Sequence, residues 1–355
     1  MKLLSILHRW TGAFLGILLA VLGLTGTILV WEGDWIGLPG AHDPLREDVA
    51  IIGRIVERAA ADGQLSRITF ASDEIGLHQL VFEDGGGAYV RQSGEVVDRW
   101  ASQWERPELW LFDLHHHLFA ADAGETVTGV AGVAGLLFVL TGLVLWWRGR
   151  ASFRPTLLPK RFAPGPIVKH HRDLGLLLSP VLALSLLTGV AMVFTPLRSA
   201  LIGSEERPKQ TLAVGKQVDA REALVRAKAM FPDAALRRIT FPSAPDKPVV
   251  VRMRQPLEWT PNGRTQISFG ADGTVSVENA RAANRSASLA EKLYPVHSAK
   301  IGGLVMKLLM TLSGLCLFVL GTFATYSFWA RRSNKKRRKS AGRSLARISV
   351  ANGGL

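Results

Sequence analysis

The sequence predicts a multi-pass membrane protein in which four transmembrane helices alternate with two α+β modules. Three observations lead to this fold class. Four long uncharged runs are spread along the 355 residues, two polar segments between them share one pattern of a helix followed by strands, and the landmarks of the first run recur in the third. Repetition of this kind predicts an internal duplication, with two spans and one module in each half.

The four uncharged runs are the predicted spans. Each is 22 to 24 residues long, which suffices to cross a hydrocarbon core of roughly 30 Å at about 1.5 Å per residue. The first run is too long for the apolar region of a signal peptide, and no small-x-small cleavage pattern follows it, so we expect an uncleaved anchor. The runs occupy residues 10–31, 126–147, 174–197 and 308–330.

The first and third runs repeat one another at fixed offsets. In both, a threonine follows a histidine by seventeen residues. Small residues and Thr-Gly pairs are ordinary where membrane helices cross, and we expect that role for them here. The matching landmarks are His8-Arg9 with His171-Arg172, Gly12 with Gly175, Ala20 with Ala183, and Thr25-Gly26 with Thr188-Gly189.

The formal net charge of +14 is concentrated on the short segments outside the runs. Residues 1–9, 148–173 and 331–355 together hold 18 lysines and arginines and one acid, a bias that marks the cytoplasmic side. Both termini are therefore expected in the cytoplasm. The basic tail is expected to bind anionic membrane lipid, at about 1 kcal/mol per side chain, rather than nucleic acid.

The spans and the charge bias divide the chain into eight parts. In order, they are the first span with its leading residues (1–31), a first outer module (32–125), the second span (126–147), a basic cytoplasmic loop (148–173), the third span (174–197), a second outer module (198–307), the fourth span (308–330) and a basic cytoplasmic tail (331–355).

The two outer modules share one pattern of elements. A helix is expected at 46–61 in the first module and at 219–230 in the second, and each is followed by strand-like runs separated by Gly, Pro and Asp turns. The string Arg-Ile-Thr-Phe recurs directly after each helix, at 67–70 and 238–241. Each module is therefore predicted to be one helix on its own small antiparallel sheet. The strands are expected at 66–72, 78–84, 88–92, 236–241, 249–255, 265–270 and 274–279.

Histidines, glycines and aromatic-basic pairs mark the ends of the runs. These motifs are His8-Arg9-Trp10, Leu114-His115, His171-Arg172, and Pro295-Val296-His297 with Gly302-Gly303 at the openings, and Trp146-Trp147-Arg148 and Trp329-Ala330-Arg331 at two closings. As a set, they resemble the PepSY-associated transmembrane family, iron-regulated membrane proteins that include ferric-siderophore reductases. The resemblance covers nearly the full chain. It implies a bacterial inner-membrane domain that carries b-type haem on histidines, with two PepSY-like modules in the periplasm.

Topology sorts four of the histidines into two pairs. The first and third spans run outward, so His8 and His171 are expected on the cytoplasmic side. The second and fourth spans run inward, so His115 and His297 are expected on the periplasmic side. Two histidines at one depth can fill both axial positions of a haem iron through neutral imidazole nitrogens. We therefore expect two b-type haems, one near each face, with these four histidines as ligands of the iron.

Neighbouring histidines leave alternatives to this assignment. Only one of His115, His116 and His117 can face a given partner, because adjacent helical residues point about 100° apart. The family pattern favours His115, and the repeat favours His171 over His170. The other three could ligate haem themselves, hold a propionate or substrate iron, or lie in the membrane interface.

Other candidate groups have weaker signals. Arg9 and Arg172 each follow a proposed ligand and could pair with haem propionates through charge-assisted hydrogen bonds, although positive-inside placement explains them equally well. Cys316 is the single cysteine and lies within a span, so neither a disulfide nor thiolate ligation of haem is expected. The string Gly85-Gly86-Gly87 lacks the spacing of a nicotinamide or flavin site.

The modules carry opposite net charges, −11 for residues 32–125 and +8 for residues 198–307. Opposite charges favour association, so we expect the modules to dock on each other. A cleft between them, above the periplasmic haem, is the expected place for a ferric chelate.

Together, these patterns and the resemblance predict a ferric-siderophore reductase, a haem-dependent enzyme that passes electrons from a quinol or a cytoplasmic reductase to a periplasmic ferric siderophore. No catalytic acid, base or nucleophile is assigned. The competing hypothesis is a non-enzymatic, membrane-anchored module that binds or restrains a periplasmic partner such as a peptidase; the pairing of histidines by membrane side argues against it. Transport of a metal ion would require acids within the spans, and the four runs contain none.

Overall fold

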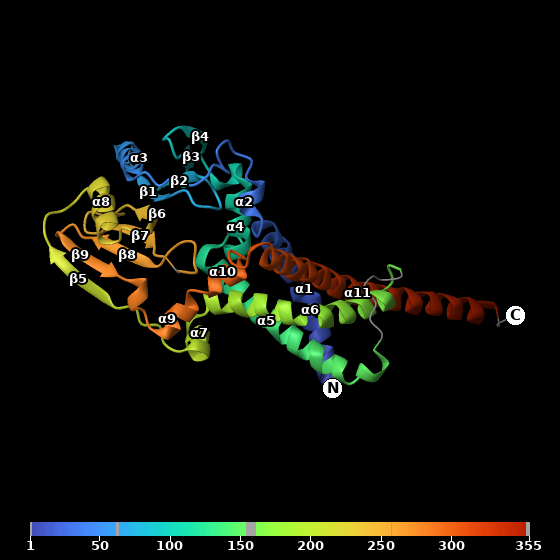
Figure 1. Cartoon of the computed structure of the whole chain (residues 1–355). Helices are drawn as coiled ribbons and strands as arrows, with labels where there is room; N and C mark the ends of the chain where they lie inside the picture. Colours follow the sequence, from blue (N-terminus) through green and yellow to red (C-terminus); the bar gives the residue numbers. More distant parts are fainter. Residues whose placement is uncertain (1, 62–63, 154–160, 257, 353–355) are drawn as a thin grey trace. The chain divides into compact units, whose positions relative to one another are not determined.

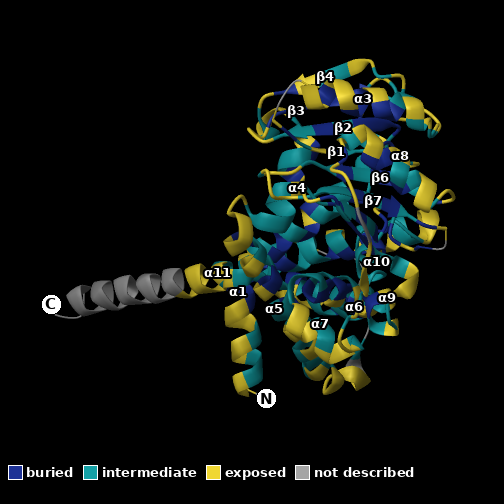
Figure 2. Cartoon of the chain, turned by 90° about the vertical axis from the view of Figure 1, so that its left-hand side faces the viewer, coloured by how far each residue is buried: buried dark blue, intermediate teal, exposed yellow. Residues whose placement is uncertain are grey.

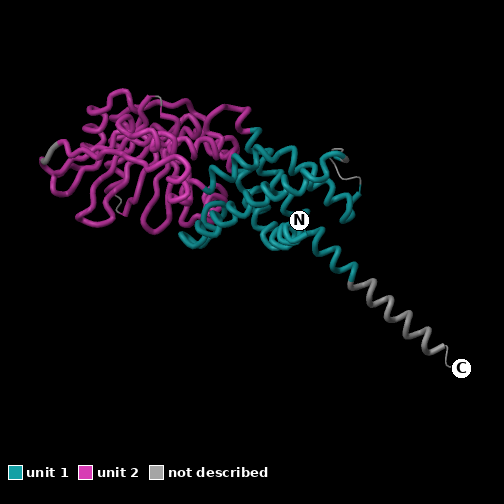
Figure 3. The backbone as a smooth tube through the Cα atoms, turned by 90° about the horizontal axis from the view of Figure 1, so that it is seen from below, with its two compact units in different colours: residues 1–28, 114–190, 308–355 teal, residues 29–113, 191–307 magenta. Residues whose placement is uncertain are grey.

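The computed structural model describes residues 2–61, 64–153, 161–256 and 258–352, which fold into two compact units. The first, here called the helical unit, comprises Met1–Ile28, Leu114–Val190 and Leu308–Leu355. The second, the sheet unit, comprises Leu29–Asp113 and Ala191–Lys307 (Figure 3). Each unit is thus assembled from segments distant in sequence, as a chain of alternating spans and modules requires.

Four helices in the described part of the chain are long and apolar enough to cross a membrane. Many of their residues are exposed (Figure 2), and these include large apolar side chains; Phe14, Leu137 and Leu177, for example, are 62%, 55% and 59% exposed. Such a surface suits contact with lipid, and the chain is a multi-pass membrane protein. The helices are α1 (Lys2–Leu29), α5 (Ala121–Trp147), α6 (Pro164–Val193) and α11 (Gly303–Asn352), whose apolar part is Gly303–Lys335.

Glycines bring α1 and α11 close together. A Cβ atom at Gly16 would lie 2.6 Å from the carbonyl oxygen of Gly321, and one at Gly23 would lie 2.5 Å from that of Gly314. Both distances are shorter than a van der Waals contact, so only glycine fits at this helix separation. These positions have the crossing role expected of small residues in the spans. The basic run at 335–339 belongs to the far end of α11, where side chains from residue 336 onward lie outside the described residues.

The sheet unit is built on one antiparallel sheet of nine strands within the described residues, in the order β4-β3-β2-β1-β6-β7-β8-β9-β5 (Figure 1). Helices α3 (Val49–Ala61) and α8 (Ala220–Met230) contribute the apolar side chains that pack on one face of the sheet. The strands are β1 (Leu65–Thr69), β2 (Leu77–Phe82), β3 (Gly87–Arg91), β4 (Val96–Trp100), β5 (Lys209–Val214), β6 (Ala235–Thr240), β7 (Val249–Arg254), β8 (Thr265–Phe269) and β9 (Thr274–Glu278).

The recurring Arg-Ile-Thr-Phe strings join the two modules. β1 pairs with β6 so that Ile68 lies opposite Ile239, and both side chains are fully buried. The pairing is symmetric: Phe70 N donates to Arg237 O and Phe241 N donates to Ser66 O, each at 2.9 Å. The expectation of a separate sheet for each module was therefore wrong. Edge strands with matching apolar faces stabilise one another when their backbone groups pair, and here they form one continuous sheet.

Ion pairs reinforce this junction with the charges that the sequence predicts. Glu47 of the first module contacts Lys228 of α8 at 2.5 Å, and Glu57 of α3 contacts Arg221 of α8 at 3.1 Å. In both pairs the acid belongs to the acidic module and the base to the basic module. The Glu57 pair is exposed and contributes little to stability, whereas the half-buried Glu47 pair also fixes the backbone, because Glu47 Oε2 accepts from Leu236 N at 3.0 Å.

Short helices connect the larger elements. The helix expected at 46–61 begins at Val49, after Asp48, whose carboxylate accepts from two amides of the first turn. α8 begins after Asp219, whose side chain accepts from Glu222 N at 2.7 Å. The remaining short helices are α2 (Glu32–Trp35), α4 (Pro107–His117), α7 (Thr195–Ile202), α9 (Arg285–Ala290) and α10 (Leu293–His297), with 3-10 turns at Gln103–Glu105, Arg150–Ser152 and Ala280–Ala282.

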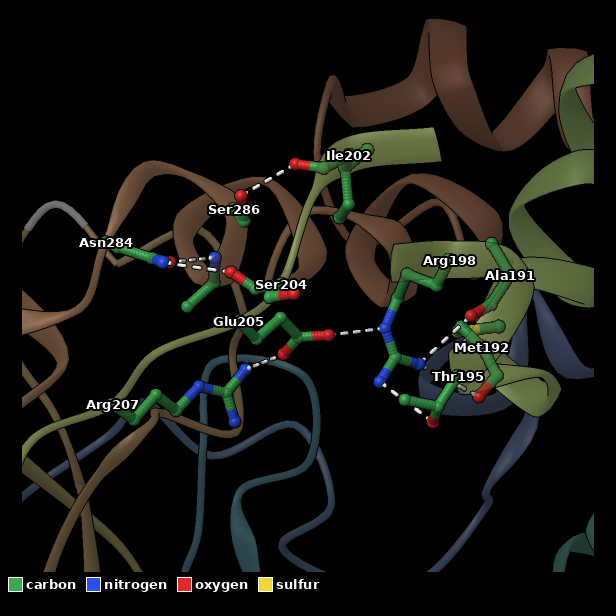
Figure 4. A network of polar contacts seen from close by, with 11 residues as sticks. Ala191, Met192, Thr195, Arg198, Ile202, Ser204, Glu205, Arg207, Asn284 and Ser286 are labelled. Carbon is green, nitrogen blue, oxygen red and sulfur yellow. Dashed lines mark hydrogen bonds and ion pairs between the residues drawn. The ribbon is translucent and has the colours of Figure 1, made fainter. Parts of the chain in front are cut away.

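Arg198 on α7 closes the end of α6. Its Nη1 donates to the carbonyl oxygens of Ala191 and Met192, at 3.0 Å and 3.4 Å, in the last turn of α6 (Figure 4). The last carbonyls of a helix have no partner within the helix, and a cation there also complements the helix dipole. Glu205 accepts from Arg198 and from Arg207, so it holds the capping guanidinium in place.

Buried His78 makes the stability of the protein depend on pH. The side chain is 2% exposed, its Nδ1 accepts from Ala71 N at 3.0 Å, and burial lowers its pKa to about 4. Because the unfolded chain takes up a proton near pH 6.5 and the folded chain does not, stability falls as the pH drops from about 6.5 to about 4, by roughly 3 kcal/mol in total.

This prediction is checked by the thermal unfolding midpoint of the full chain in detergent between pH 7.5 and pH 4.5. We expect the midpoint of the wild-type protein to fall faster with acidification than that of His78→Gln. His42→Gln, a change at an exposed histidine of the same module, serves as the control and should keep the wild-type slope. Equal slopes for wild type and His78→Gln would refute the assignment.

Candidate cofactor-binding site

The helical unit contains a cavity of about 720 Å³ lined by all four of its long helices. Sites for cofactors and other small molecules usually have volumes of about 300–1,000 Å³, so this cavity has room for a cofactor. The middle of the cavity is apolar, so a ligand there would be shielded from water. Its apolar wall includes Leu19 of α1, Phe138 of α5, Leu182 and Leu186 of α6, and Leu317 and Leu320 of α11.

His8 of α1 and His171 of α6 face this cavity together. Their ring centroids are 6.4 Å apart, and the ring planes are inclined by 85°. Two imidazoles that share one metal ion have centroids roughly 6 Å apart, because each metal–nitrogen bond is about 2 Å long. The separation of these rings therefore suits two axial ligands of one iron.

Thr141 of α5 orients the ring of His8. The Thr141 hydroxyl lies 2.6 Å from the carbonyl oxygen of Leu137, to which it can donate its single hydrogen. His8 Nδ1 lies 2.7 Å from the same hydroxyl oxygen. When the hydroxyl donates to Leu137, its oxygen accepts from a protonated Nδ1, and Nε2 of His8 is left as a ligand nitrogen. A second hydrogen bond of this kind orients most metal-binding histidines.

Two buried polar atoms at the cavity wall have no hydrogen-bond partner within the described residues. They are Nδ1 of His171 and Nε1 of Trp146. An unpaired buried polar group costs about 1–3 kcal/mol, and such groups are rare in folded proteins. They are consistent with a site that a ligand completes.

Basic side chains line the cavity where α1 and α6 begin and where the apolar part of α11 ends. Arg172 Nη2 contacts Asp173 Oδ1 at 2.7 Å, and the Arg332 guanidinium lies 4.3 Å from the centre of the Trp10 ring. Guanidinium groups bind carboxylates through charge-assisted hydrogen bonds. The basic residues of the lining are Arg9, Arg172, Arg331, Arg332 and Lys335.

Glycines keep this cavity open. A Cβ atom at Gly142 would face His8 Cε1 at 3.8 Å, and one at Gly175 would meet Leu320 Cδ1 at 3.5 Å. Both distances are ordinary van der Waals contacts, so close packing of the helices does not by itself require glycine at these two positions. An apolar cavity with paired imidazoles, a basic end and small residues along its wall fits a b-type haem: the histidines would hold the iron and the arginines the propionates.

His115 is oriented by α1 in the same way as His8 is oriented by α5. Thr25 Oγ1 lies 2.9 Å from His115 Nδ1 and donates its hydrogen to Val21 O at 2.9 Å. A Cβ atom at Gly26 would lie 2.9 Å from His115 Cε1, so glycine is needed for the ring to fit. The Thr-Gly pairs at 25–26 and 141–142 thus each receive a histidine ring, a role beyond helix crossing.

A strained turn follows the run of three histidines. His115, His116 and His117 end α4, a separate helix that precedes α5, so they lie before the second span as expected. The non-glycine residues after the run have left-handed backbones, which cost energy and are typical of functional sites. They are Leu118, Phe119 and Ala121, with φ of 49°, 60° and 46°.

Contacts with the start of α5 stabilise this turn. Thr128 donates to the carbonyl oxygen of His116 at 3.1 Å, and a Cβ atom at Gly124 would lie 1.5 Å from the carbonyl oxygen of His117. The close approach of α5 to the histidine run therefore requires glycine at 124.

The other candidate ligands lie outside the cavity lining. His170 is 5% exposed and packs against Phe323, with ring centroids 5.6 Å apart. His297 ends α10 in the sheet unit, whereas His115 belongs to the helical unit, so their pairing stays a prediction. Among the described residues, no three His, Cys, Asp or Glu side chains group in a way that could hold a bare metal ion.

Sequence reasoning missed several residues of this site. Thr141 and Thr25 belong to Thr-Gly pairs that the sequence shows. Their histidine partners lie on other helices, so sequence spacing does not reveal these hydrogen bonds. Trp146 and Arg332 were identified only as an aromatic-basic end and a basic tail, because membrane topology explains both without a ligand.

Replacement of Thr141 by valine, which has the same shape, removes the hydrogen bond to His8. We expect haem to bind roughly 10- to 100-fold more weakly in the cavity. The midpoint potential should rise, because His8 becomes a weaker electron donor and the ferric state loses stabilisation. Haem titration and a spectroelectrochemical midpoint of the purified full chain measure both effects. Thr126→Val, on the exposed surface of α5, is the control. An unchanged potential in Thr141→Val would contradict this role.

Comparison with known proteins finds one family whose model matches most of the chain. A family model described as the PepSY-associated TM region matches residues 5–332. The matched segment includes both histidines that face the cavity and four of its five basic residues. No curated protein matches the chain.

Proposed function

Since the chain belongs to the PepSY-associated transmembrane family, we propose that it is a b-type dihaem oxidoreductase of the bacterial inner membrane that passes electrons outward to reduce ferric siderophores. In this proposal both termini and the basic segments are cytoplasmic, and the sheet unit is periplasmic. The electron donor is a quinol or a cytoplasmic reductase.

The observation that carries the proposal is the pair of imidazoles at 6.4 Å in an apolar cavity. His8 and His171 would hold one haem, and Arg9 and Arg172, which line the same cavity, would bind its propionates. A haem iron held by two imidazoles carries one electron by changing between the ferric and ferrous states. The cavity walls would exclude water, and Thr141 would hold the His8 tautomer, so little reorganisation would accompany electron transfer.

The second proposed pair consists of His115 and His297. Support for it comes from Thr25, which orients His115 as Thr141 orients His8. His116 and His117 are the alternatives on the same helix, and His170 is the alternative to His171. Two cofactors would divide a path across a core of about 30 Å into shorter steps.

The proposed reaction transfers one electron to a ferric chelate and yields ferrous iron. Ferrous iron binds siderophores more weakly, so reduction releases the metal without breaking a bond in the chelator. No proton-transfer group or nucleophile is required, and the chain's contribution is the position and the potential of its cofactors.

Single-turnover kinetics test this function. The purified full chain is reduced with dithionite, freed of excess reductant and mixed anaerobically with ferric siderophore and a ferrous-specific chromogenic chelator. We expect reoxidation of the protein to match the ferrous iron trapped, electron for electron. Thr126→Val, a change on α5 outside the cavity lining, is the control and should react as the wild type does. A reduced, haem-containing protein that ferric siderophores do not oxidise would refute the reductase activity.

A further inference from the structure

A row of polar side chains crosses the face of the sheet opposite α3 and α8. Alternate residues of a strand point to opposite faces, and Ile68 and Ile239 belong to the buried face. Thr69 lies opposite Arg238, and Arg238 lies opposite Arg252. In strand order the row is Gln79, Thr69, Arg238, Arg252, Gln266 and Glu278.

The arginines of this row are arranged at the expense of stability. Like charges directly opposite each other in a sheet destabilise it, as Arg238 and Arg252 do here. Within the described residues, the side chains of Arg238, Arg252 and their neighbour Arg67 make no hydrogen bond and no ion pair within 4.0 Å. Burial, with repulsion from Arg67 and Arg252, lowers the pKa of Arg238 to about 10.

A fourth arginine lies nearby with an unsatisfied group. Arg237 occupies the bulge before Arg238 and is 7% exposed. Its Nη1 donates to Ala71 O at 3.4 Å, and its Nε has no hydrogen-bond partner among the described residues. A buried cation with an unsatisfied donor is costly unless an anion completes it.

Three of these arginines, Arg237, Arg238 and Arg252, meet at a small pocket of about 40 Å³ on the junction of the two modules. The volume has room for one small oxyanion and not for a whole chelate. Hydroxyl and amide donors complete the wall, together with one carboxylate, that of Glu74, which contacts Lys300 at 2.5 Å. The polar lining is Thr69, Ser72, Glu74, Arg237, Arg238, Arg252 and Asn262.

The charges around the pocket favour an anion. Three arginines face one carboxylate in the lining, and Lys300 already pairs with that carboxylate. Asp73 and Glu47 approach Arg237 from the first module, and Glu278 approaches Arg252 from the far end of the row. These acids offset part of the guanidinium charge, but they are not part of the lining, and the pKa values of Arg237 and Arg252 stay below their usual range because of burial and neighbouring arginines.

We propose that this pocket binds one oxyanion group, a carboxylate or catecholate, of a larger soluble ligand, and that this ligand is an anionic ferric chelate. The identity of the ligand rests on the proposed function; the oxyanion site does not. Arginine suits this task because its planar donors match carboxylate oxygens in pairs. The junction of the two modules would thus select substrates by charge.

Binding of a redox-inert analogue tests the site apart from electron transfer. Gallium citrate is titrated into the full chain in neutral lipid nanodiscs, with inorganic phosphate as a competitor and a cationic gallium trihydroxamate for comparison. We expect gallium citrate to bind, phosphate to compete, and Arg238→Gln and Arg252→Gln to weaken citrate binding roughly tenfold or more. Arg281→Gln, at an exposed arginine of the same module, is the control and should bind as the wild type does.

The thermal stability of the Arg238→Gln variant distinguishes a binding role of this arginine from a structural one. Arg238→Gln removes a repulsive charge, so its thermal unfolding midpoint without ligand should equal or exceed that of the wild type. A lower midpoint, or citrate binding unchanged in both variants, would overturn the proposal. Arginine-dependent binding of phosphatidylglycerol vesicles without binding of soluble anions would also overturn it, because the anion would then be a lipid headgroup. Since gallium is not reduced, these outcomes do not depend on whether the protein reduces iron.

Discussion

Replacement of His171 by alanine is expected to remove haem from the cavity of the helical unit. The imidazole would supply one of two axial bonds, and among the described residues that line the cavity His8 is the only other histidine. The pyridine haem count of the purified full chain should fall from about two per chain to about one. Imidazole added to the buffer should restore part of the loss, because it fits the space that the side chain vacates.

His170→Ala is the matched control for this change. His170 is the adjacent residue on α6 and is 5% exposed, but it packs against Phe323 and does not line the cavity. We expect this variant to keep the wild-type haem count. Loss of haem from His170→Ala with retention in His171→Ala would reverse the assignment.

Gly142→Leu is expected to exclude haem from the same cavity with both histidines in place. A Cβ atom at this position faces His8 Cε1 at 3.8 Å, so the larger side chain would occupy the volume that the cofactor needs. Folding should persist, because the added atoms enter the cavity and not a helix crossing such as that at Gly23. The haem count should fall to about one per chain, as in His171→Ala.

The thermal unfolding midpoint without added haem distinguishes exclusion from misfolding. It should equal or exceed that of the wild type in Gly142→Leu, since buried apolar atoms stabilise the bundle. Gly142→Ala adds one methyl group at an ordinary contact distance and should keep both haems. A Gly142→Leu protein with its full haem count would show that the cofactor does not lie in this cavity.

Local sequence signals predicted most of the helices and strands. The runs 126–147 and 308–330 lie within α5 and α11, whereas 10–31 and 174–197 extend two and four residues past the ends of α1 and α6. The repeated helix-and-strand pattern corresponds to α3 with β1–β3 and α8 with β6–β9. These elements have strong local signals: the spans are long runs without a charged residue, and the strands alternate apolar and polar residues between turn residues. β4 and β5 were missed, because Val96–Trp100 and Lys209–Val214 are short edge strands whose pairing depends on distant partners.

The joining of the modules could not be predicted from local patterns. The string Arg-Ile-Thr-Phe was recognised as a repeat, but its use as a pairing strand depends on the two copies meeting across the sheet, with Ile68 opposite Ile239. The opposite net charges of the two modules predicted that the modules associate, but not that they do so by pairing β1 with β6. The separation of α4 from α5 was missed because Leu118 and Phe119 adopt left-handed backbones that their residue types disfavour.

The candidate site was predicted in part. His8 and His171 were paired from topology and the repeat, and the structure brings their rings together on one cavity. The hydroxyl partners were not predicted, because Thr141 and His8 are 133 residues apart and meet only when the helices pack. The pairing of His115 with His297 remains a prediction that haem ligation in single variants will test.

The central claim is that this membrane protein carries haem on paired histidines. Its most direct test is the visible spectrum of the full chain, purified in detergent, before and after dithionite, with a pyridine haem count per chain. The account predicts about two b-type haems with a low-spin reduced spectrum. Protein made with ample haem supply that contains none would contradict it and would favour a membrane-anchored module that binds a periplasmic partner.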